Sequence, residues 1–258
     1  WRNKLMTQDK PKIALVTGAS RGLGKNTALA VAKKGVGVIV TYLNGEAEAK
    51  SVVSEIEAMG NKAVALQLDI GSIETLDAFV IQVKQALQNT WDIEQFDFLI
   101  NNAGISGGSL FAETTEEEFD RLFNVNFKGV FFLTQKLLPL LKDGGRIVNV
   151  SSFLTRTIRP GRAIYASMKG AIEVLTRSLA KELGQRQITV NVVAPGAIAT
   201  EGSVVRDNPE INKYIASQTA LGRVGEPDDI GGAIALLLSE ENRWITGQRI
   251  EVSGGQSL

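Results

Sequence analysis

The stretch "KIALVTGASRGLGKNTALAVAKKG", Lys12–Gly35, decides the fold, because a short apolar run passes through a glycine-rich turn directly into a segment of helical period. Gly18, Gly22 and Gly24 lie on this turn, where missing side chains let the backbone approach a pyrophosphate and the helix N-terminus adds a favourable dipole. The spacing is GxxxGxG instead of GxGxxG, and three glycines can also serve only a tight turn. The position of the turn, after a strand and before an amphipathic helix, favours dinucleotide binding.

Six further apolar runs follow along the chain, separated by segments of helical period such as "AEAKSVVSEIEAMG" and "DDIGGAIALLLSEE". Most runs are apolar on consecutive positions, which is typical of strands covered on both faces of a parallel sheet. This alternation predicts an α/β protein with a Rossmann fold, a doubly wound parallel sheet of about seven strands with helices on both faces. The six runs are "VGVIVTY", "KAVALQLD", "FDFLINNAG", "GRIVNVSS", "ITVNVVAPG" and "QRIEVSGG".

The domain organisation follows from the length and from the lack of Pro- or Ser-rich linkers. The chain has 258 residues and 44% apolar content, enough for a sizeable core, and we expect a single catalytic domain over residues 12–258. Residues 1–11 begin with Trp1 and contain Met6, so they are expected to be an N-terminal leader that was in part added for expression. This leader is polar, and no apolar run approaches the roughly 20 residues of a membrane-spanning helix. We therefore expect a cytoplasmic protein without a membrane partner.

The composition also excludes several classes of function. The 28 Lys and Arg residues balance the 28 Asp and Glu residues, so no basic excess is left for binding a nucleic acid. The chain has no cysteine and no histidine, which excludes thiolate nucleophiles, Ser-His-Asp hydrolysis and metal sites built from Cys or His. We expect no metal, and acid–base chemistry must use Tyr, Lys, Asp or Glu.

A tyrosine and a lysine stand four positions apart in "IYASMKG", on what reads as a helix. At this spacing Tyr165 and Lys169 are neighbours on one helical face. A phenol ordinarily titrates near 10, and an adjacent ammonium is expected to lower its pKa toward the working range. Such a tyrosine could exchange a proton with a carbonyl or hydroxyl group without histidine. The pattern YxxxK alone is common, however, and needs support from elsewhere.

That support comes thirteen residues before Tyr165, where the buried run "GRIVNVSS" ends in Ser151 and Ser152. Ligands of parallel α/β sheets bind beyond the carboxyl ends of the strands, where these hydroxyls emerge. Ser152 could therefore hydrogen-bond a substrate oxygen and orient it for proton transfer from Tyr165. The alternative is that the two serines only form a turn, as serines often do.

The end of the second apolar run bears on the choice of cofactor. NAD-binding versions of this fold carry an acid there for the ribose hydroxyl, whereas this run ends in Thr41, Tyr42, Leu43 and Asn44. No carboxylate is thus expected to repel a 2′-phosphate, and Arg21 in the glycine loop could pair with one. The sequence favours NADP(H) over NAD(H), with a merely solvated Arg21 as the alternative.

These motifs together resemble the short-chain dehydrogenase/reductase family over the chain from about Lys12 onward. The resemblance is carried by "TGASRGLG", "NNAG", "NVNFKGVFFL", Ser152, "YASMK" and "NVVAPG", in that order. Within the family, "RSLAKELGQRQITVNVVAPG" and "LGRVGEPDDIGGAIALLLS" are similar to the 3-oxoacyl-[acyl-carrier-protein] reductase group and to related sugar, steroid and ketone reductases.

The resemblance implies a role for each matching position. Tyr165 would be the general acid/base, Lys169 would lower its pKa and hold the nicotinamide ribose, and Ser152 would bind the substrate oxygen. Asn126, in the helix before the fifth strand, would hold a water that connects Lys169 to solvent. The implied cofactor-binding positions are Gly18, Ser20, Arg21, Gly22, Leu23 and Gly24 in the glycine loop; Tyr42, Leu43 and Asn44; Asp69 and Ile70 beside the adenine; Asn102, Ala103 and Gly104 at the ribose; Tyr165 and Lys169; and Pro195, Gly196, Ile198 and Thr200 over the nicotinamide amide.

The substrate is harder to read. Carrier-protein reductases use a basic docking surface, whereas the predicted turn before the fifth strand, "LLKDGGRI", is short and follows Lys142 with Asp143. Arg156, Arg159 and Arg162 could attract an anionic small substrate, although such arginines are more often solvated or at subunit contacts. The long segment "SVVRDNPEINKYIASQTALGRV" is expected to be a lid loop that sets substrate choice.

We therefore expect a reversible NADPH-dependent carbonyl reductase that acts on a small carbonyl or alcohol substrate. A 3-oxoacyl-[acyl-carrier-protein] reductase of fatty acid synthesis is the alternative within this class. A non-catalytic dinucleotide sensor or scaffold, and an isomerase or dehydratase with tightly bound cofactor, are alternatives of other classes. The family likeness further implies a homotetramer, or a homodimer, with the Tyr165 helix and the C-terminal strand near subunit contacts.

Overall fold

All seven apolar runs form strands of one sheet in the computed structural model, which describes residues 11–258. Residues 1–10, and with them most of the predicted leader, lie outside the described residues. The strand order is β3-β2-β1-β4-β5-β6-β7 and every pairing is parallel, which confirms the predicted doubly wound sheet. The strands are β1 (Ile13–Val16), β2 (Gly37–Tyr42), β3 (Ala63–Gln67), β4 (Phe96–Asn101), β5 (Leu141–Val150), β6 (Thr189–Pro195) and β7 (Arg249–Val252).

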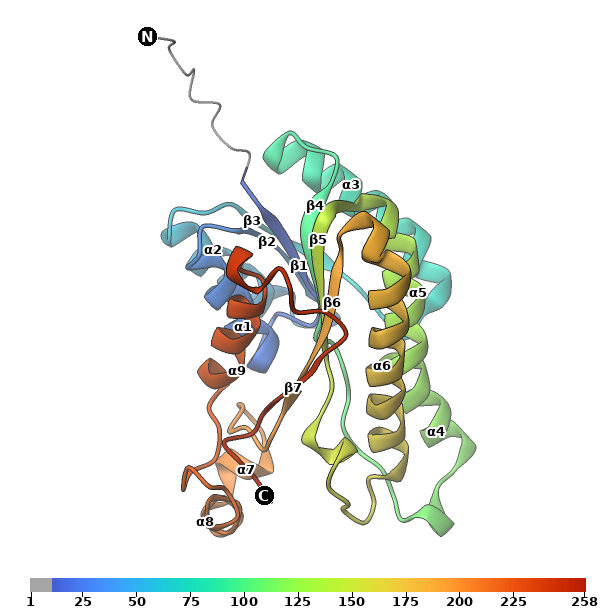
Figure 1. Cartoon of the computed structure of the whole chain (residues 1–258), viewed down its shortest axis with the longest axis vertical. Coiled ribbons are helices and arrows are strands. Elements are labelled where there is room, and N and C mark those ends of the chain that lie inside the picture. Colours follow the sequence, from blue (N-terminus) through green and yellow to red (C-terminus); the bar gives the residue numbers. More distant parts are fainter. Residues whose placement is uncertain (1–10) are drawn as a thin grey trace.

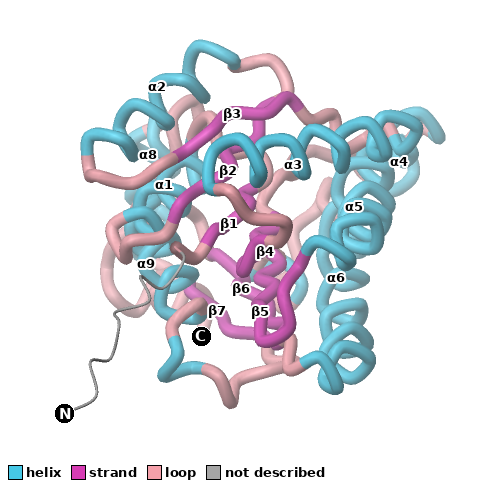
Figure 2. The backbone as a smooth tube through the Cα atoms, turned by 90° about the horizontal axis from the view of Figure 1, so that it is seen from above, coloured by secondary structure: helices cyan, strands magenta, loops and turns pink. Residues whose placement is uncertain are grey.

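Helices cover both faces of the sheet, as Figure 1 and the view from above in Figure 2 show. On one face lie α1 (Gly22–Ala32), α2 (Glu46–Ala58) and α9 (Pro227–Leu237). On the other lie α3 (Leu76–Trp91), α5 (Gly129–Leu137) and α6 (Ala163–Glu182). The helix α4 (Glu116–Phe123) continues into α5 through a π-helical turn, η3 (Asn124–Lys128).

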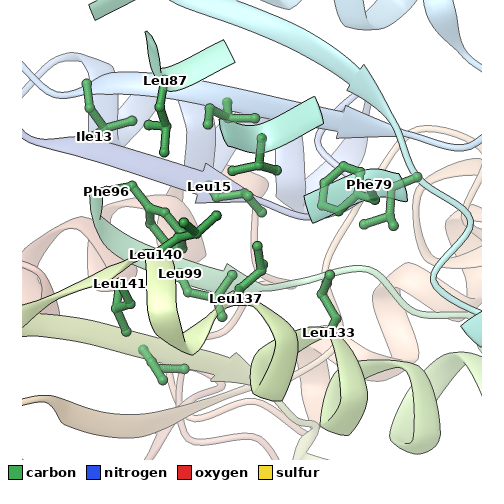
Figure 3. Packing of buried hydrophobic residues seen from close by; sticks show 14 of the residues in the cluster. Ile13, Leu15, Phe79, Leu87, Phe96, Leu99, Leu133, Leu137, Leu140 and Leu141 are labelled. Carbon is green, nitrogen blue, oxygen red and sulfur yellow. The ribbon is translucent and has the colours of Figure 1, made fainter. Parts of the chain in front are cut away.

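The strand β1 shows how the sheet separates two cores. Successive side chains of a strand point to opposite faces. Ile13 and Leu15 accordingly pack with residues of α3 and α5 (Figure 3), whereas Ala14 and Val16 pack with residues of α1, α2 and α9. Burial of one such Leu or Ile side chain is worth about 1.5–3 kcal/mol. Burial on both faces is why the runs in the sequence are continuously apolar and not alternating.

Two expectations about irregular segments are corrected. The predicted short turn before the fifth strand is part of β5, because Phe96 pairs with Leu141 while Phe98 pairs with Arg146. Residues 142–145 bulge out between these two pairs, and Gly144 has a φ of 76°, a conformation that glycine adopts without strain. The predicted lid loop contains two helices, α7 (Val204–Asp207) and α8 (Pro209–Ser217), which are capped by the side chains of Ser203 and Asn208.

No helix in the described part of the chain is both long and apolar enough to cross a membrane.

Candidate active site

The glycine turn after β1 is held by side chains from two neighbouring strands. Gly18 has a φ of 62°, and its N–H donates to Oγ1 of Thr41 at 3.1 Å. Asn102, just after β4, donates through Nδ2 to the carbonyl oxygens of Thr17 at 2.8 Å and Gly18 at 3.2 Å. The buried hydroxyl of Thr17 in turn accepts from the N–H groups of Asn102 and Ala103 at 2.9 Å. The turn is therefore fixed before any ligand binds.

The same turn leaves room for a pyrophosphate at the start of α1. A Cβ on Gly24 would lie 2.1 Å from the carbonyl oxygen of Gly18, so the helix could not approach the turn so closely with any other residue. The N-cap residue Arg21 makes no side-chain cap, and the first turn of α1 carries no acid. The first amides of a helix need acceptors, and an anion satisfies them. Gly18, Gly22 and Gly24 thus fit the pyrophosphate of a dinucleotide.

The ribose end of the predicted cofactor site includes Arg21 and the end of β2. Arg21 is exposed and takes part in none of the ion pairs among residues 11–258, so its guanidinium is available to a phosphate. Asn44 and Leu43 are exposed as well, while Tyr42 packs against the core beside α1 and α2. The carboxylate of Glu48, however, lies 3.0 Å from where a Cβ on Gly45 would be, beside the hydroxyl of Ser20. A carboxylate of the first turn of α2 thus lies near the loop after β2, although the last residues of the second apolar run carry none.

The remaining predicted cofactor positions follow β3, β4 and β6. The carboxylate of Asp69 accepts from the N–H of Gly71 at 2.9 Å and from the hydroxyl of Ser72 at 2.8 Å. The side chain of Ile70 lies in the core, so only its main chain remains for a nucleotide. Gly104 is exposed, Ala103 and Leu23 are half-buried, and the segment of Pro195, Gly196, Ile198 and Thr200 meets Gly22 through the methyl group of Thr200.

Ser152, Tyr165 and Lys169 come together at the carboxyl end of β5, which is the lower end of the sheet in Figure 1. Ser152 caps the short 3-10 turn η5 (Phe153–Thr155), and its hydroxyl forms a hydrogen bond with Tyr165. Both Tyr165 and Lys169 lie on the first turns of α6, with the Lys169 Nζ 5.8 Å from the centre of the Tyr165 ring. That Nζ donates to the carbonyl oxygen of Val150 at 2.9 Å. The structure thus brings together Ser152, Tyr165 and Lys169, as the sequence predicted.

The pKa of Tyr165 is shifted in the direction opposite to the one expected from the sequence. Burial raises the pKa of the Tyr165 hydroxyl above its usual value, and this outweighs the hydrogen bond with Ser152 and the charge of Arg162, which both lower it. Burial also lowers the pKa of Lys169 to about 8. The predicted lowering of the Tyr165 pKa by Lys169 is wrong in this structure, since the ammonium faces the ring and a carbonyl and not the hydroxyl. The cation that acts on the phenol is Arg162, at the start of α6.

The low pKa of Lys169 makes the stability of the protein depend on pH. Between about pH 8 and the ordinary pKa of 10.5, the unfolded chain binds more protons at this position than the folded one. The free energy of unfolding should therefore rise with pH in this window. From pH 7 to pH 9.5 we expect the wild type to gain about 2 kcal/mol relative to Lys169→Met, measured by urea unfolding. Lys181→Met, at an exposed position of the same helix, is the control. The expectation would be contradicted if the wild type and Lys169→Met differed in unfolding free energy by the same amount at pH 7 and pH 9.5.

Asn126 lies in the π-helical turn η3 and is fully buried. Its Nδ2 donates to the carbonyl oxygens of Leu122 and Ile105 at 3.0 Å, and its Oδ1 accepts from the N–H of Ile105 at 3.3 Å. A Cβ on Gly104 would lie 2.9 Å from this Oδ1 and 3.3 Å from the Lys169 Nζ. Asn126 and Lys169 therefore face the same small space beside Gly104. Single π-helical turns inside α-helices are frequent at functional sites, and this one aims Asn126 at that space.

Three contributors to the site were missed in the sequence. Thr17 fixes the glycine turn, Gln256 accepts from the Ala197 N–H at 2.8 Å and so braces the segment after β6, and Glu173 accepts from Ser151 at 2.8 Å. No pattern in one sequence marks them, because each acts across the fold. Of the three arginines proposed for an anionic substrate, Arg156 is engaged by Glu251 at 2.7 Å and 3.0 Å. Its charge is thus paired with a carboxylate of the same protein.

A pocket of about 540 Å³ opens beside the glycine turn, between α1 and the segment after β6. It does not include the three catalytic candidates. Arg206 of α7 and Asn212 of α8 line it on the side away from α1. The pocket is lined by Gly22, Lys25, Asn26, Leu29, Ala199, Glu201, Arg206, Asn212, Glu226 and Pro227.

Comparison with known proteins gives matches over almost the whole chain. A family model described as enoyl-(acyl carrier protein) reductase matches residues 18–257. The 3-oxoacyl-[acyl-carrier-protein] reductase of Staphylococcus aureus (strain Mu50) is 38% identical over 252 residues, which are 96% of this chain and 98% of that protein. Among solved structures, the angucycline C-6 ketoreductase LanV with bound NADP is 39% identical, with a TM-score of 0.91 over 95% of each chain.

A short-chain dehydrogenase/reductase from Serratia marcescens BCRC 10948 is also similar, at 33% identity and a TM-score of 0.88 over 96% of this chain and 98% of that one. Matches of this length and identity, on a chain that brings the glycine turn and Ser152, Tyr165 and Lys169 to one edge of its sheet, establish the family. The protein belongs to the short-chain dehydrogenase/reductase family and is an NAD(P)-dependent oxidoreductase of CH–OH and C=O groups.

Proposed function

We propose that the protein is an NADPH-dependent ketone reductase, reversible as an alcohol dehydrogenase, in which Tyr165 is the proton donor. The observation that carries the proposal is the meeting of Ser152, Tyr165 and Lys169 at the carboxyl end of β5, beside a glycine turn suited to a dinucleotide. Ligands of doubly wound sheets bind at this edge.

In this reaction NADPH, when bound, supplies the hydride, and the protein supplies position and a proton. The Ser152 hydroxyl donates to the substrate carbonyl oxygen and sets its orientation. The Tyr165 hydroxyl donates its proton to the same oxygen as negative charge develops there. Its raised pKa keeps Tyr165 protonated at neutral pH, which suits a proton donor in the direction of reduction. Lys169 would hold the nicotinamide ribose, and Asn126 would hold a water between Lys169 and solvent.

The proposed preference for NADP(H) rests on Arg21. Its unpaired guanidinium is suited to a 2′-phosphate, and the similar LanV structure contains NADP. Glu48 opposes this, because its carboxylate lies beside Ser20 at the same end of the site. The preference for NADP(H) therefore depends on the opposing charges of Arg21 and Glu48. Substituting each of them separately measures the two contributions.

The charges next to the β5 bulge lie near the amino end of the strand, away from Ser152 at its carboxyl end, so they do not decide between a small ketone and an acyl-carrier-protein substrate. Lys142 is bonded to both carboxylate oxygens of Asp97, at 3.2 Å and 3.3 Å, and Asp143 is bonded to Arg186 at 2.7 Å. These charges are used within the protein. A ring ketone is favoured instead by the similarity to LanV, an angucycline C-6 ketoreductase.

The proposal is tested by following NADPH and NADH oxidation with 2-tetralone, ethyl acetoacetate and acetoacetyl-coenzyme A. We expect the highest kcat/KM with 2-tetralone and NADPH. Arg21→Ala should lower kcat/KM for NADPH about 10- to 100-fold, the range of a charge-assisted hydrogen bond, and change that for NADH little. Glu48→Gln, which removes the opposing charge, should raise kcat/KM for NADPH.

Equal losses with both nucleotides in Arg21→Ala would contradict the NADP preference. Faster turnover of the acyl thioester than of either ketone would favour the carrier-protein reductase. Nucleotide binding with no net NADPH oxidation across the panel would favour a sensor, or an isomerase or dehydratase.

A homotetramer, or a homodimer, and a cytoplasmic location belong to the same proposal. Two surfaces support assembly: the edge strand β7, which is only half-buried, and a row of rings, Phe119, Phe123, Phe127 and Phe131. The rings follow one another at 5.8–6.3 Å along α4, η3 and α5, with Phe119 42% and Phe131 37% exposed. Aromatic residues in such a patch are typical of interfaces. Native mass measurement tests the assembly, and cell fractionation tests the location.

A further inference from the structure

Glu173 binds three donors from three different segments of the protein through one carboxylate oxygen. Its Oε1 accepts from the hydroxyls of Ser151 and Thr155, each at 2.8 Å, and from Nε of Arg249 at 2.9 Å. The carboxylate side chain is 13% exposed, and that of Arg249 is 24% exposed. A shielded ion pair of this kind is stronger and better ordered than one on the open surface.

The three partners surround Ser152 in the chain. Ser151 precedes it at the end of β5, and Thr155 closes the 3-10 turn that Ser152 begins. Arg249 also reaches Ser152 itself, since its NH2 donates to the Ser152 carbonyl oxygen at 3.4 Å and to the Thr155 hydroxyl at 3.2 Å. These polar contacts of Glu173 therefore act on the residues just before and just after Ser152, or on the guanidinium that holds the Ser152 carbonyl.

Glu173 stands on the same helix as the residues that Ser152 must meet. It follows Lys169 by four positions on α6, one helical turn, and Tyr165 by eight. The Ser151 hydroxyl bridges this region, because it also lies 3.2 Å from the Lys169 carbonyl oxygen. A single rigid helix thus carries both the proposed proton donor and the carboxylate that fixes the segment of Ser152.

The ion pair extends to the other side of the site. Arg249 also donates to Glu251 at 3.0 Å, and Glu251 accepts from Arg156, which follows η5. Arg156 holds the carbonyl oxygens of Gln256 and Ser257 at 2.9 Å and 3.1 Å, and Gln256 braces Ala197 after β6. The ion pairs of Arg249 and Arg156 therefore connect the segment of Ser152 to β7. Through Gln256 they also connect it to the segment after β6 that is proposed to cover the nicotinamide.

We propose that Glu173 is a positioning residue that, with Arg249, holds Ser152 at the distance from Tyr165 that proton transfer requires. The inference rests on the proposed function and deepens it. Misplacement of a reacting group by about 1 Å can cost about 100-fold in rate. Loss of the Glu173 charge loosens Ser152 but leaves the glycine turn untouched, so it should lower kcat and spare nucleotide binding.

The test compares Glu173→Gln with Glu182→Gln, an exposed glutamate near the end of the same helix. With 2-tetralone and NADPH, Glu173→Gln should lower kcat about 10- to 100-fold. The Kd for NADPH, measured by its fluorescence, should stay within about twofold of the wild type, the small change expected for a site remote from the nucleotide. Glu182→Gln should match the wild type in both measurements.

A second pair of variants separates positioning from folding, since Glu173→Gln leaves Arg249 with one fewer counter-charge. Thr155→Val removes one hydroxyl ligand of Glu173 at constant size and should lower kcat, whereas Thr155→Ser keeps the hydroxyl and should restore it. Wild-type kcat in both Glu173→Gln and Thr155→Val, with Tyr165→Phe inactive, would overturn the positioning role alone. Full activity of Tyr165→Phe would instead overturn the proposed function. If Glu173→Gln does not fold, the Thr155 pair decides.

Discussion

Replacing Tyr165 with Phe should lower kcat for 2-tetralone reduction about 1,000-fold, within the 100- to 10,000-fold range of a general acid. The ring would remain beside Lys169 and only the hydroxyl that bonds to Ser152 would be lost. No other titratable hydroxyl is placed there: Tyr214 lies on α8 and is 65% exposed, and Tyr42 packs beside α1 and α2. Steady-state kinetics with NADPH measure the loss.

The matched control is Tyr214→Phe, which makes the same chemical change on the exposed face of α8 and should keep wild-type kcat. The Kd for NADPH should change far less than kcat in Tyr165→Phe, because the glycine turn and Lys169 are intact. Burial is expected to keep the hydroxyl protonated, so the loss should be as large at pH 6 as at pH 8. A Tyr165→Phe enzyme with more than about a tenth of wild-type kcat would show that the proton comes from elsewhere.

Replacing Gly24 with Ala should abolish NADPH binding and lower the melting temperature by several degrees. The added methyl group would lie 2.1 Å from the Gly18 carbonyl oxygen and 2.5 Å from the Asn102 Nδ2. The first contact is with backbone, so relief requires that α1 move away from the turn. Overpacking of this kind typically costs about 1–3 kcal/mol, occasionally more, and it opens the cradle for the pyrophosphate.

Gly232→Ala on α9 provides the control, since nothing lies within 4 Å of the added carbon and alanine favours a helix over glycine by about 1 kcal/mol. That variant should bind NADPH normally and melt at the same temperature or higher. Thermal unfolding and fluorescence titration distinguish the two. Normal NADPH affinity in Gly24→Ala would mean that the turn is not where the pyrophosphate binds.

The parts of the fold that follow from local patterns could be predicted from the sequence. The strands could be predicted because β1 and its neighbours are buried along their whole length and are therefore apolar at consecutive positions. The ends of α1 and α2 could be predicted because Gly35 and Gly60 follow them, with φ values of 79° and 86° that are typical of glycines after helices. The site residues Ser152, Tyr165 and Lys169 could also be placed together, because parallel strands deliver their carboxyl ends to one edge.

What the sequence could not give depends on contacts between distant segments. Glu48 reaches back toward Ser20 only because of how α2 leaves β2, and the direction of the Tyr165 pKa depends on how deeply α6 is buried. The bulge in β5 requires knowledge of the pairing with β4. The role of Glu173 could not be predicted, because its partner Arg249 lies on β7, far away in the sequence.

The contacts of β7 have a consequence for the order in which the active site matures during synthesis. Residues Arg249, Glu251 and Gln256 leave the ribosome after Ser152, Tyr165 and Lys169, yet they hold the segments on both sides of the site. The first six strands emerge before β7, because the strands are synthesised in chain order. The segments on both sides of the site can therefore reach their final positions only after β7 has docked.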